Sequence, residues 1–375
     1  MKIKNILLKG AYGQPNFGDD ILMMILNNYL KSNDYNFKIL VPFKAKYIES
    51  LVLLKNIQYY VDHQLDADFL IYGGGTQFYS FPKTKMNSRL LLVRSFYENP
   101  KEFFSYLKNR KKRISLNVNA DKTMALGIGL GPFNGPNSFN AKKNALSKLR
   151  DMKYIMVRDK WSHSILQSNN ILSTLANDLC FAPQNYLPFE IKDRVKQRKI
   201  KSITFILRDW PHTNDNIHIE KCIRFIKKHE GKNKYKFKKI VLFANDSNCE
   251  RLLLKEKIEY IKWDPYTSNI QDFIDIIYDT DLVISSRYHG IILSAISKTL
   301  FIPIEVDPKL SLFTEDIYNQ KIGWKFPYND LDLSKEIEKL TKYSTEYLSN
   351  ADIKIEEYRQ LMKSTLLEVD SLLNE

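Results

Sequence analysis

The chain has 375 residues, of which 44% are hydrophobic and 27% charged, and its formal net charge at pH 7 is +14. These values are ordinary for a globular protein, and they exclude disordered and fibrous classes. The length exceeds the ~250–300 residues at which a single hydrophobic core usually stops growing, so we expect two domains.

The first half of the chain alternates short apolar runs with segments of helical periodicity. Alternation of this kind predicts parallel sheets built from β-α-β units. The predicted strands are Ile3–Leu8, Phe37–Val41, Asp68–Tyr72, Thr123–Ile128 and Tyr154–Val157. The predicted helices are Ile21–Leu30, Ala141–Leu149 and Trp161–Gln167.

A second alternating series follows the stretch Phe181–Lys201, whose prolines and charged run predict a linker. Its predicted strands are Ser202–Leu207, Lys239–Phe243, Leu282–Ser285 and Leu300–Val306. Its predicted helices are Ile217–Lys228, Cys249–Lys257, Ile270–Tyr278 and Ile291–Ile296. We therefore expect an α/β protein with doubly wound domains at residues 1–185 and 200–335, followed by C-terminal helices at 336–375.

Three cationic side chains, Arg208, Arg287 and Lys309, each follow a predicted strand of the second series. In doubly wound sheets ligands bind beyond the carboxyl ends of the strands, and neighbouring strands lie ~4.8 Å apart. If these strands are neighbours, the three charges converge on one small anion. A single arginine after a strand is more often part of a surface ion pair, but three cations at one sheet edge favour an anion site.

The segment Ser285–Gly290 joins a predicted strand to a helix, so the first N–H groups of that helix face the same cleft. A helix N-terminus beside an arginine is well suited to bind phosphate. Gly290 would allow a ligand or the backbone to approach closely. His289 lies inside the cationic ring, where an imidazole can donate a proton or orient the group that does.

Glycine-rich loops follow predicted strands of the first half at residues 10–20, 73–75 and 127–131. None fits the dinucleotide or P-loop motif, so NAD and ATP are not expected. Tight turns explain these glycines equally well; alternatively, the loops open the cleft wall to a bulky acceptor. The polar groups suited to sugar hydroxyls, one of which could act as a base, are Asn16, Asp19 and Asp20.

The excess positive charge is concentrated in basic runs at residues 108–113, 192–201 and 227–239. Solvated surface lysines are the commonest explanation of such runs, and contact with an anionic membrane surface is the alternative. The sequence has no RNA-binding, zinc-ligand or helix-turn-helix motif, so we expect no nucleic-acid partner.

The three cysteines are widely spaced and odd in number, which favours a reducing compartment over a disulfide framework. The N-terminus lacks the long apolar segment and cleavage site of a signal peptide, and no run approaches the ~18 apolar residues of a membrane span. We expect a cytoplasmic protein, with the inner face of the membrane as a further location.

The order of these motifs resembles the polysaccharide pyruvyltransferase family over roughly residues 5–315. The residues that carry the resemblance are Asn16-Phe-Gly-Asp19, Gly73-Gly-Gly75, Val157-Arg-Asp159, Asn177-Asp178, Arg208, Arg287-Tyr-His-Gly290 and Asp307-Pro-Lys309. The most specific of them are the N-x-G-D loop, the R-x-H-G segment and the lysine that follows it.

The resemblance implies a glycosyltransferase-B-like fold, in which two Rossmann-like domains face each other across a cleft. It implies phosphoenolpyruvate as donor substrate and a sugar of a cell-surface polysaccharide, free or lipid-linked, as acceptor. The products would be a pyruvate ketal and phosphate, without a cofactor or metal. The implied donor-side residues are Arg208, Arg287, His289, Gly290 and Lys309, of which Arg287 and His289 would be catalytic. The implied acceptor-side residues are Asn16, Asp19, Asp20, Gly74 and Gly75.

Two other classes of protein compete with this interpretation. A glycosyltransferase of the same fold would use a nucleotide sugar, although the sequence shows no acidic motif for a nucleotide ribose. A non-catalytic binding protein would be free to lose the Arg–His–Lys set, which is intact here. Residues 80–119 have no counterpart in the family, and we interpret them as a surface insertion near the acceptor side that could touch anionic lipid or an acidic glycan.

Overall fold

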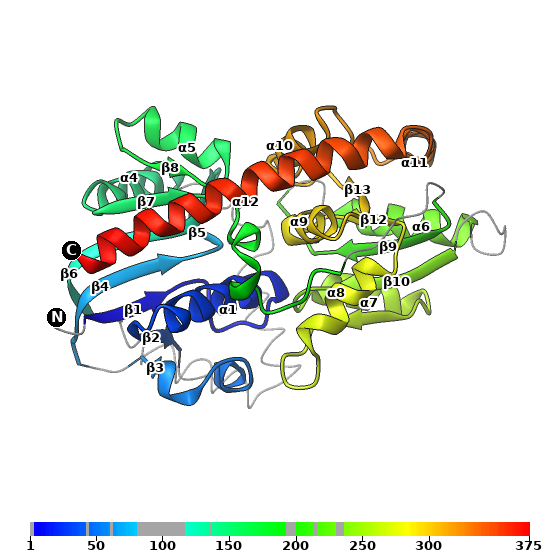
Figure 1. Cartoon of the computed structure of the whole chain (residues 1–375). Coiled ribbons are helices and arrows are strands. Elements are labelled where there is room, and N and C mark those ends of the chain that lie inside the picture. Colours follow the sequence, from blue (N-terminus) through cyan, green and yellow to red (C-terminus); the bar gives the residue numbers. More distant parts are fainter. Residues whose placement is uncertain are drawn as a thin grey trace.

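A computed structural model describes residues 4–42, 45–60, 63–80, 117–135, 137–192, 200–212, 216–229 and 236–375. Two parallel sheets, each accompanied by helices, form the two halves of the molecule (Figure 1). The basic run at 108–113, most of the predicted insertion 80–119 and part of the predicted linker lie outside the described residues. The predicted domain boundaries stay predictions.

The first sheet has the strand order β3-β2-β1-β4-β6-β7-β8, with β5 paired to β6. Its strands are β1 (Asn5–Lys9), β2 (Asn36–Val41), β3 (Ile57–Tyr59), β4 (Leu65–Gly73), β5 (Thr76–Ser80), β6 (Val118–Phe133), β7 (Tyr154–Val157) and β8 (Thr174–Leu175). Its helices are α1 (Phe17–Ser32), α4 (Ser138–Arg150) and α5 (Lys160–Gln167).

The second sheet has the strand order β11-β10-β9-β12-β13. Its strands are β9 (Ser202–Leu207), β10 (Lys236–Leu242), β11 (Tyr260–Lys262), β12 (Leu282–Ser285) and β13 (Leu300–Pro303). Its helices are α6 (Ile217–His229), α7 (Ser247–Lys255), α8 (Ile270–Tyr278), α9 (Tyr288–Ile296) and α10 (Pro308–Tyr318), followed by α11 (Asp330–Lys342) and α12 (Ser344–Asn374).

Three adjacent strands of the second sheet are buried along their whole length, which explains why their sequences are mostly apolar. Every residue of β9, β12 and β13 is buried, as expected for parallel strands covered on both faces. These three strands are adjacent in the order β9-β12-β13. Convergence of the three cations required that the strands before them be neighbours, and they are.

Several helices begin earlier than their apolar periodicity predicts, and α10 is not predicted at all. Helix α1 begins at Phe17 instead of Ile21, and α9 begins at Tyr288 instead of Ile291. Helix α10 has no predicted counterpart; it begins at Pro308, and Asp307 caps it by accepting a hydrogen bond from the backbone N–H of Lys309. Polar first turns do not contribute to an apolar period, so the pattern misses them.

The two halves are joined next to the start of α1. The backbone N–H of Phe17 donates to the carbonyl of Phe243, 2.8 Å away. The Phe17 ring packs against Phe243, Trp263 and Phe273 at centroid distances of 4.7–5.0 Å. Helix α12 also runs across both halves (Figure 1). This apolar cluster fixes the start of α1 against the second sheet.

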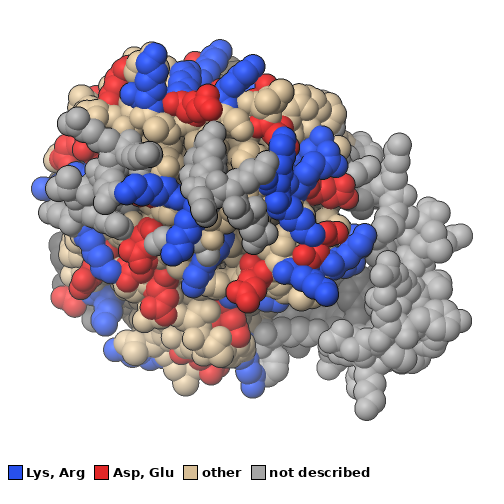
Figure 2. All heavy atoms as spheres, turned by 90° about the vertical axis from the view of Figure 1, so that its right-hand side faces the viewer, with Lys and Arg blue, Asp and Glu red and all other residues tan. Residues whose placement is uncertain are grey.

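The face of the second half shown in Figure 2 carries lysines and arginines interspersed with acidic side chains. Within the described part of the run at 227–239, Lys227 pairs with Glu256 and Lys228 pairs with Asp330. Part of this run's charge is therefore neutralised locally. Within the described residues, no helix combines the length and apolar character needed to cross a membrane.

Candidate active site

A cavity of about 210 Å³ lies where the carboxyl ends of strands from both sheets approach each other. Residues of the first half that line it are Ala11, Asn16, Asp19, Thr76, Tyr79, Gly131 and Arg158. Residues of the second half that line it are Arg208, Trp210, Phe243, Arg287, Tyr288, His289 and Lys309. Its position agrees with the rule that doubly wound sheets bind ligands beyond their strand ends.

The donor-side residues predicted from the sequence come together in this cavity, with one exception. Arg208 directly follows β9, Arg287 is the N-cap of α9, and Lys309 lies in the first turn of α10. Gly290 does not line the cavity. A Cβ on Gly290 would lie 2.2 Å from Ser285 Oγ, so its small size allows α9 to pack on the end of β12.

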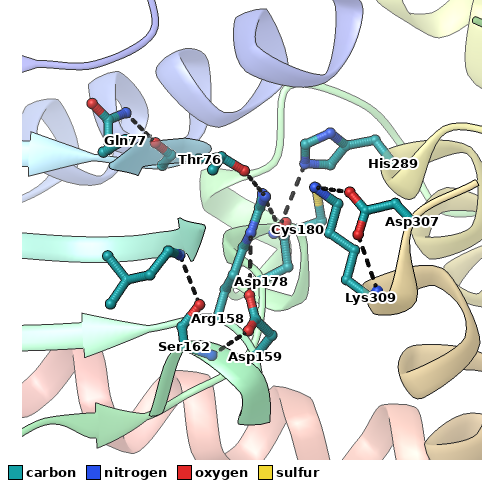
Figure 3. Close-up of polar contacts among 12 residues, drawn as sticks. Thr76, Gln77, Arg158, Asp159, Ser162, Asp178, Cys180, His289, Asp307 and Lys309 are labelled. Carbon is teal, nitrogen blue, oxygen red and sulfur yellow. Dashed lines mark hydrogen bonds and ion pairs between the residues drawn. The ribbon is translucent and has the colours of Figure 1, made fainter. Parts of the chain in front are cut away.

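Arg287 and Lys309 are both neutralised by carboxylates. Arg287 forms an ion pair with Asp246 through Nη2. Lys309 Nζ lies 3.0 Å from Asp307 Oδ2 (Figure 3). Ser285 Oγ also accepts a hydrogen bond from the N–H of Arg287, which holds the turn. Burial lowers the pKa of Lys309, while Asp307 opposes this effect. Both cations are thus held in place before any ligand binds.

Arg208 is the exception among these cations. Its guanidinium lies 4.2 Å above the Trp210 ring, and no carboxylate within the described part of the chain forms an ion pair with it. Its Nε is buried without a hydrogen-bond partner, as are the Nε atoms of Arg158 and Arg287, so the missing carboxylate is what sets Arg208 apart. Burial, followed by repulsion from Arg287, lowers the pKa of Arg208 to about 10. A bound anion would supply the missing counter-charge and the missing acceptor.

Asp19 faces the cations from the opposite half. Asn16 Nδ2 donates to Asp19 Oδ2 over 2.7 Å. Burial raises the pKa of Asp19, although His289, Arg158 and further cations oppose the shift. A carboxyl group with a raised pKa is a better proton acceptor near neutral pH than an ordinary aspartate.

The other predicted acceptor-side residues lie behind the cavity wall. Asp20 is buried and accepts hydrogen bonds from Trp263 Nε1 (2.7 Å) and from the Tyr47 hydroxyl (3.1 Å). Gly74 and Gly75 have φ of +61° and +70°, and a Cβ on Gly75 would lie 2.8 Å from Asp19 Oδ1. The structure thus places Asn16 and Asp19 at the cavity and gives the other three residues a supporting position.

Two charged residues at the site were quoted as motif members but were not predicted as site residues. Arg158 follows β7, lines the cavity, and places Nη1 3.3 Å from Asp178 Oδ2 (Figure 3). The same Asp178 oxygen lies 3.4 Å from His289 Nε2. The strand-end rule applied to the first sheet would have found Arg158. Asp178 lies beyond the short strand β8, which the sequence does not predict.

The sequence and the structure were compared with known proteins. The sequence matches the model of the polysaccharide pyruvyl transferase family over residues 16–308. No curated protein matches it.

Solved structures with a similar fold include a putative UDP-N-acetylglucosamine 2-epimerase from Listeria monocytogenes. The TM-score is 0.56 at 10% identity, over 93% of this chain and 90% of that one. UDP-GlcNAc 2-epimerase from Neisseria meningitidis has a TM-score of 0.53 at 11% sequence identity, over 99% of this chain and 100% of that one. Anabaena HepE in complex with UDP and glucose has a TM-score of 0.55 at 9% sequence identity, over 99% of both chains.

These likenesses confirm the predicted glycosyltransferase-B-like architecture, and at such identities they concern the fold alone. The family match covers most of both sheets and three of the cations at the cavity, Arg158, Arg208 and Arg287, and it ends one residue before Lys309. It confirms the family that the motifs predicted. This chain belongs to the polysaccharide pyruvyl transferase family.

Proposed function

We propose that this protein transfers the pyruvyl group of phosphoenolpyruvate to a sugar of a cell-surface polysaccharide or of its lipid-linked precursor. The products are a cyclic pyruvate ketal and phosphate. The observation that carries the proposal is the buried guanidinium of Arg208, which lacks a carboxylate partner within the described residues and lines a cavity with Arg287 and Lys309. Phosphoenolpyruvate carries two anionic groups on three carbons, so it matches several converging cations.

The size of the cavity favours this donor over a nucleotide sugar. Pockets for drug-sized ligands usually measure about 300–1,000 Å³. The cavity here measures about 210 Å³, which suits a small anion better than a nucleoside diphosphate with its attached sugar. The likeness to enzymes and complexes that contain UDP concerns the fold and does not supply a nucleotide site.

In the proposed reaction Arg208, Arg287 and Lys309 hold the phosphate and carboxylate of the donor and stabilise the charge that develops on the departing phosphate. His289 protonates C3 of the donor, which gives C2 oxocarbenium character, and the proton released by the second sugar hydroxyl leaves on phosphate. A sugar hydroxyl forms a bond to C2, phosphate leaves, and a second hydroxyl closes the ketal. The residues that do this work all line the same cavity.

On the acceptor side, Asp19 takes the proton of the attacking hydroxyl, and Asn16 orients the Asp19 carboxylate. The Asn16–Asp19 hydrogen bond and the raised pKa of Asp19 support this assignment. Acid and base then stand on opposite halves of the molecule, with the donor between them. This arrangement suits a reaction that adds a proton at C3 while another proton leaves the nucleophile.

We propose a cytoplasmic location, at the inner face of the membrane when the acceptor is lipid-linked. The three cysteines are free and buried, which supports a reducing compartment.

The donor assignment is tested by the variant Arg208→Gln. A hydrogen bond to a charged group contributes about 1.5–3 kcal/mol, so we expect phosphoenolpyruvate to bind roughly 10–100-fold more weakly by calorimetry. The matched control is Arg150→Gln, which removes an exposed arginine from the end of α4 and should leave affinity unchanged. Wild-type protein that binds UDP-N-acetylglucosamine but not phosphoenolpyruvate would instead favour the glycosyltransferase alternative.

A further inference from the structure

We infer that Asp178 is a positioning residue that fixes the orientation and tautomer of His289, and that this contact is formed across the two halves of the molecule. Asp178 follows the first sheet, whereas His289 lies in the first turn of α9 in the second half. The two side chains meet at 3.4 Å between Asp178 Oδ2 and His289 Nε2 (Figure 3). The inference rests on the proposed function only in taking phosphoenolpyruvate as the molecule that receives the proton of His289.

The Asp178 carboxylate is held in place independently of His289. Its side chain is 1% exposed. Its Oδ1 accepts a hydrogen bond from the N–H of Cys180 at 3.1 Å, and its Oδ2 lies 3.3 Å from Arg158 Nη1. Burial alone would raise the pKa of Asp178, but the charges of His289 and Arg158 outweigh burial and lower it. Asp178 is therefore a fixed anion against which an imidazole can be oriented.

The opposite edge of the His289 ring is set by Gly18 in the first turn of α1. A Cβ on Gly18 would lie 2.0 Å from His289 Nδ1, so any larger residue there would displace the ring. His289 is thus enclosed between Gly18 and Asp178, both of which precede the second sheet. Nε2 is buried and faces Asp178 at 3.4 Å, so we assign proton exchange with the donor to Nδ1, at the edge of the ring where Gly18 has no side chain.

The Asp178 carboxylate lies beside a ring that shares its cavity with four cations, Arg158, Arg208, Arg287 and Lys309. A carboxylate that holds one nitrogen of a catalytic histidine, while the other nitrogen transfers the proton, is a recurrent arrangement in enzymes.

A metal ion is a competing explanation of the same cluster. Ligand atoms of Asp178, Cys180 and His289 lie within 4.8 Å of one another. However, Arg158 already occupies one oxygen of Asp178, and the cations that line the cavity would repel a metal ion. Charge therefore favours the orienting role.

The test uses the full-length protein labelled with ¹⁵N-histidine, in which the His289 signals are identified among the six histidines by their loss in His289→Asn. The neutral imidazole of the wild type is expected to carry its proton on Nε2. In Asp178→Asn the amide NH₂ would face Nε2, so the proton should move to Nδ1. Turnover should then fall about 10²-fold or more, with the KM for phosphoenolpyruvate changed less than threefold.

The matched control is Asp159→Asn. Asp159 also approaches Arg158, at 3.9 Å, but the described residues show no contact between it and His289, so the His289 spectrum should not change. Gly18→Ala, compared with Ser32→Ala in the same helix, should disturb the His289 signals while phosphoenolpyruvate binding persists.

The inference is overturned if wild-type His289 carries its proton on Nδ1, or if Asp178→Asn leaves the tautomer unchanged. Should Asp178→Asn fail to fold, the wild-type tautomer and Gly18→Ala still decide the question. Zn²⁺ at micromolar concentration that shifts the wild-type His289 signals, but not those of Asp178→Asn, would favour the metal site instead. If the spectra are as expected but the protein transfers no pyruvyl group, the proposed function is refuted and the inference about Asp178 and His289 still holds.

Discussion

At the scale of single residues, the cations at the cavity differ in their partners more than in their positions. Arg158, Arg287 and Lys309 each have a carboxylate within 3.3 Å, and these pairs hold the side chains in place. Arg208 has no such partner among the described residues, although it is buried. The strand-end rule predicted that three of these cations converge, but it gave no means of ranking them. Only the pairing in space identifies Arg208 as the cation that a ligand must neutralise.

Asp19 gives a prediction at the same scale, because burial raises its pKa above the ordinary value of 3.8. Asp19 can accept a proton only when ionised, so the rate should rise with pH through this raised pKa. The acid limb of the pH–rate profile is expected above the range of an ordinary aspartate. Asp19→Asn should lower kcat by about 10²-fold and remove the limb, while phosphoenolpyruvate still binds. An unchanged acid limb in Asp19→Asn would show that another group controls it.

At the scale of elements, the sequence predicts the more buried strands, but it misses β3, β5, β8 and β11 and places several helix starts too late. The strands β9, β12 and β13 are mostly apolar and are buried along their whole length, so their pattern is unambiguous. The residues proposed to take part in the reaction lie outside these apolar runs, so the pattern does not identify them. Asp19, His289 and Lys309 all stand in the first turns of helices, where polar residues precede the apolar period. The pairing of Asp178 with His289 joins distant segments, and no local pattern predicts it.

The junction between α1 and the second half gives a prediction about stability. Burial raises the pKa of Asp20 to about 7, with hydrogen bonds from Trp263 and Tyr47 opposing the shift. Because the folded state holds this proton more tightly than the unfolded chain, Asp20 contributes stability that is lost as pH rises towards about 7. Asp20→Asn removes this dependence.

Urea unfolding of both proteins at pH 5 and pH 8 measures this effect. The free energy of unfolding of the wild type, relative to Asp20→Asn, should fall by about 1–3 kcal/mol over this range. Titrations common to both proteins cancel in the difference. A constant difference, or one that grows with pH, would mean that Asp20 is ionised in the folded protein throughout.

At the scale of the whole molecule, the site exists because two sheets meet at their carboxyl ends. The second half supplies most of the cations, and the first half supplies Asp19, Arg158 and the glycine that admits the His289 ring. Helix α12 returns from the second half to the first, where Asp370 accepts a hydrogen bond from the Tyr35 hydroxyl at 3.1 Å. The alternation of strands and helices predicted both sheets. It did not predict that α12 packs against the first half, because the periodic pattern of a helix does not specify which element the helix packs against.

The most direct measurement supplies the protein with ¹³C-labelled phosphoenolpyruvate and a panel of lipid-linked and p-nitrophenyl sugars, and follows the products by mass spectrometry. The account predicts that one class of sugar gains a labelled pyruvyl ketal, that phosphate is released in equal amount, and that Arg208→Gln slows both. Transfer of a sugar from UDP-N-acetylglucosamine, with the label remaining in phosphoenolpyruvate, would contradict it.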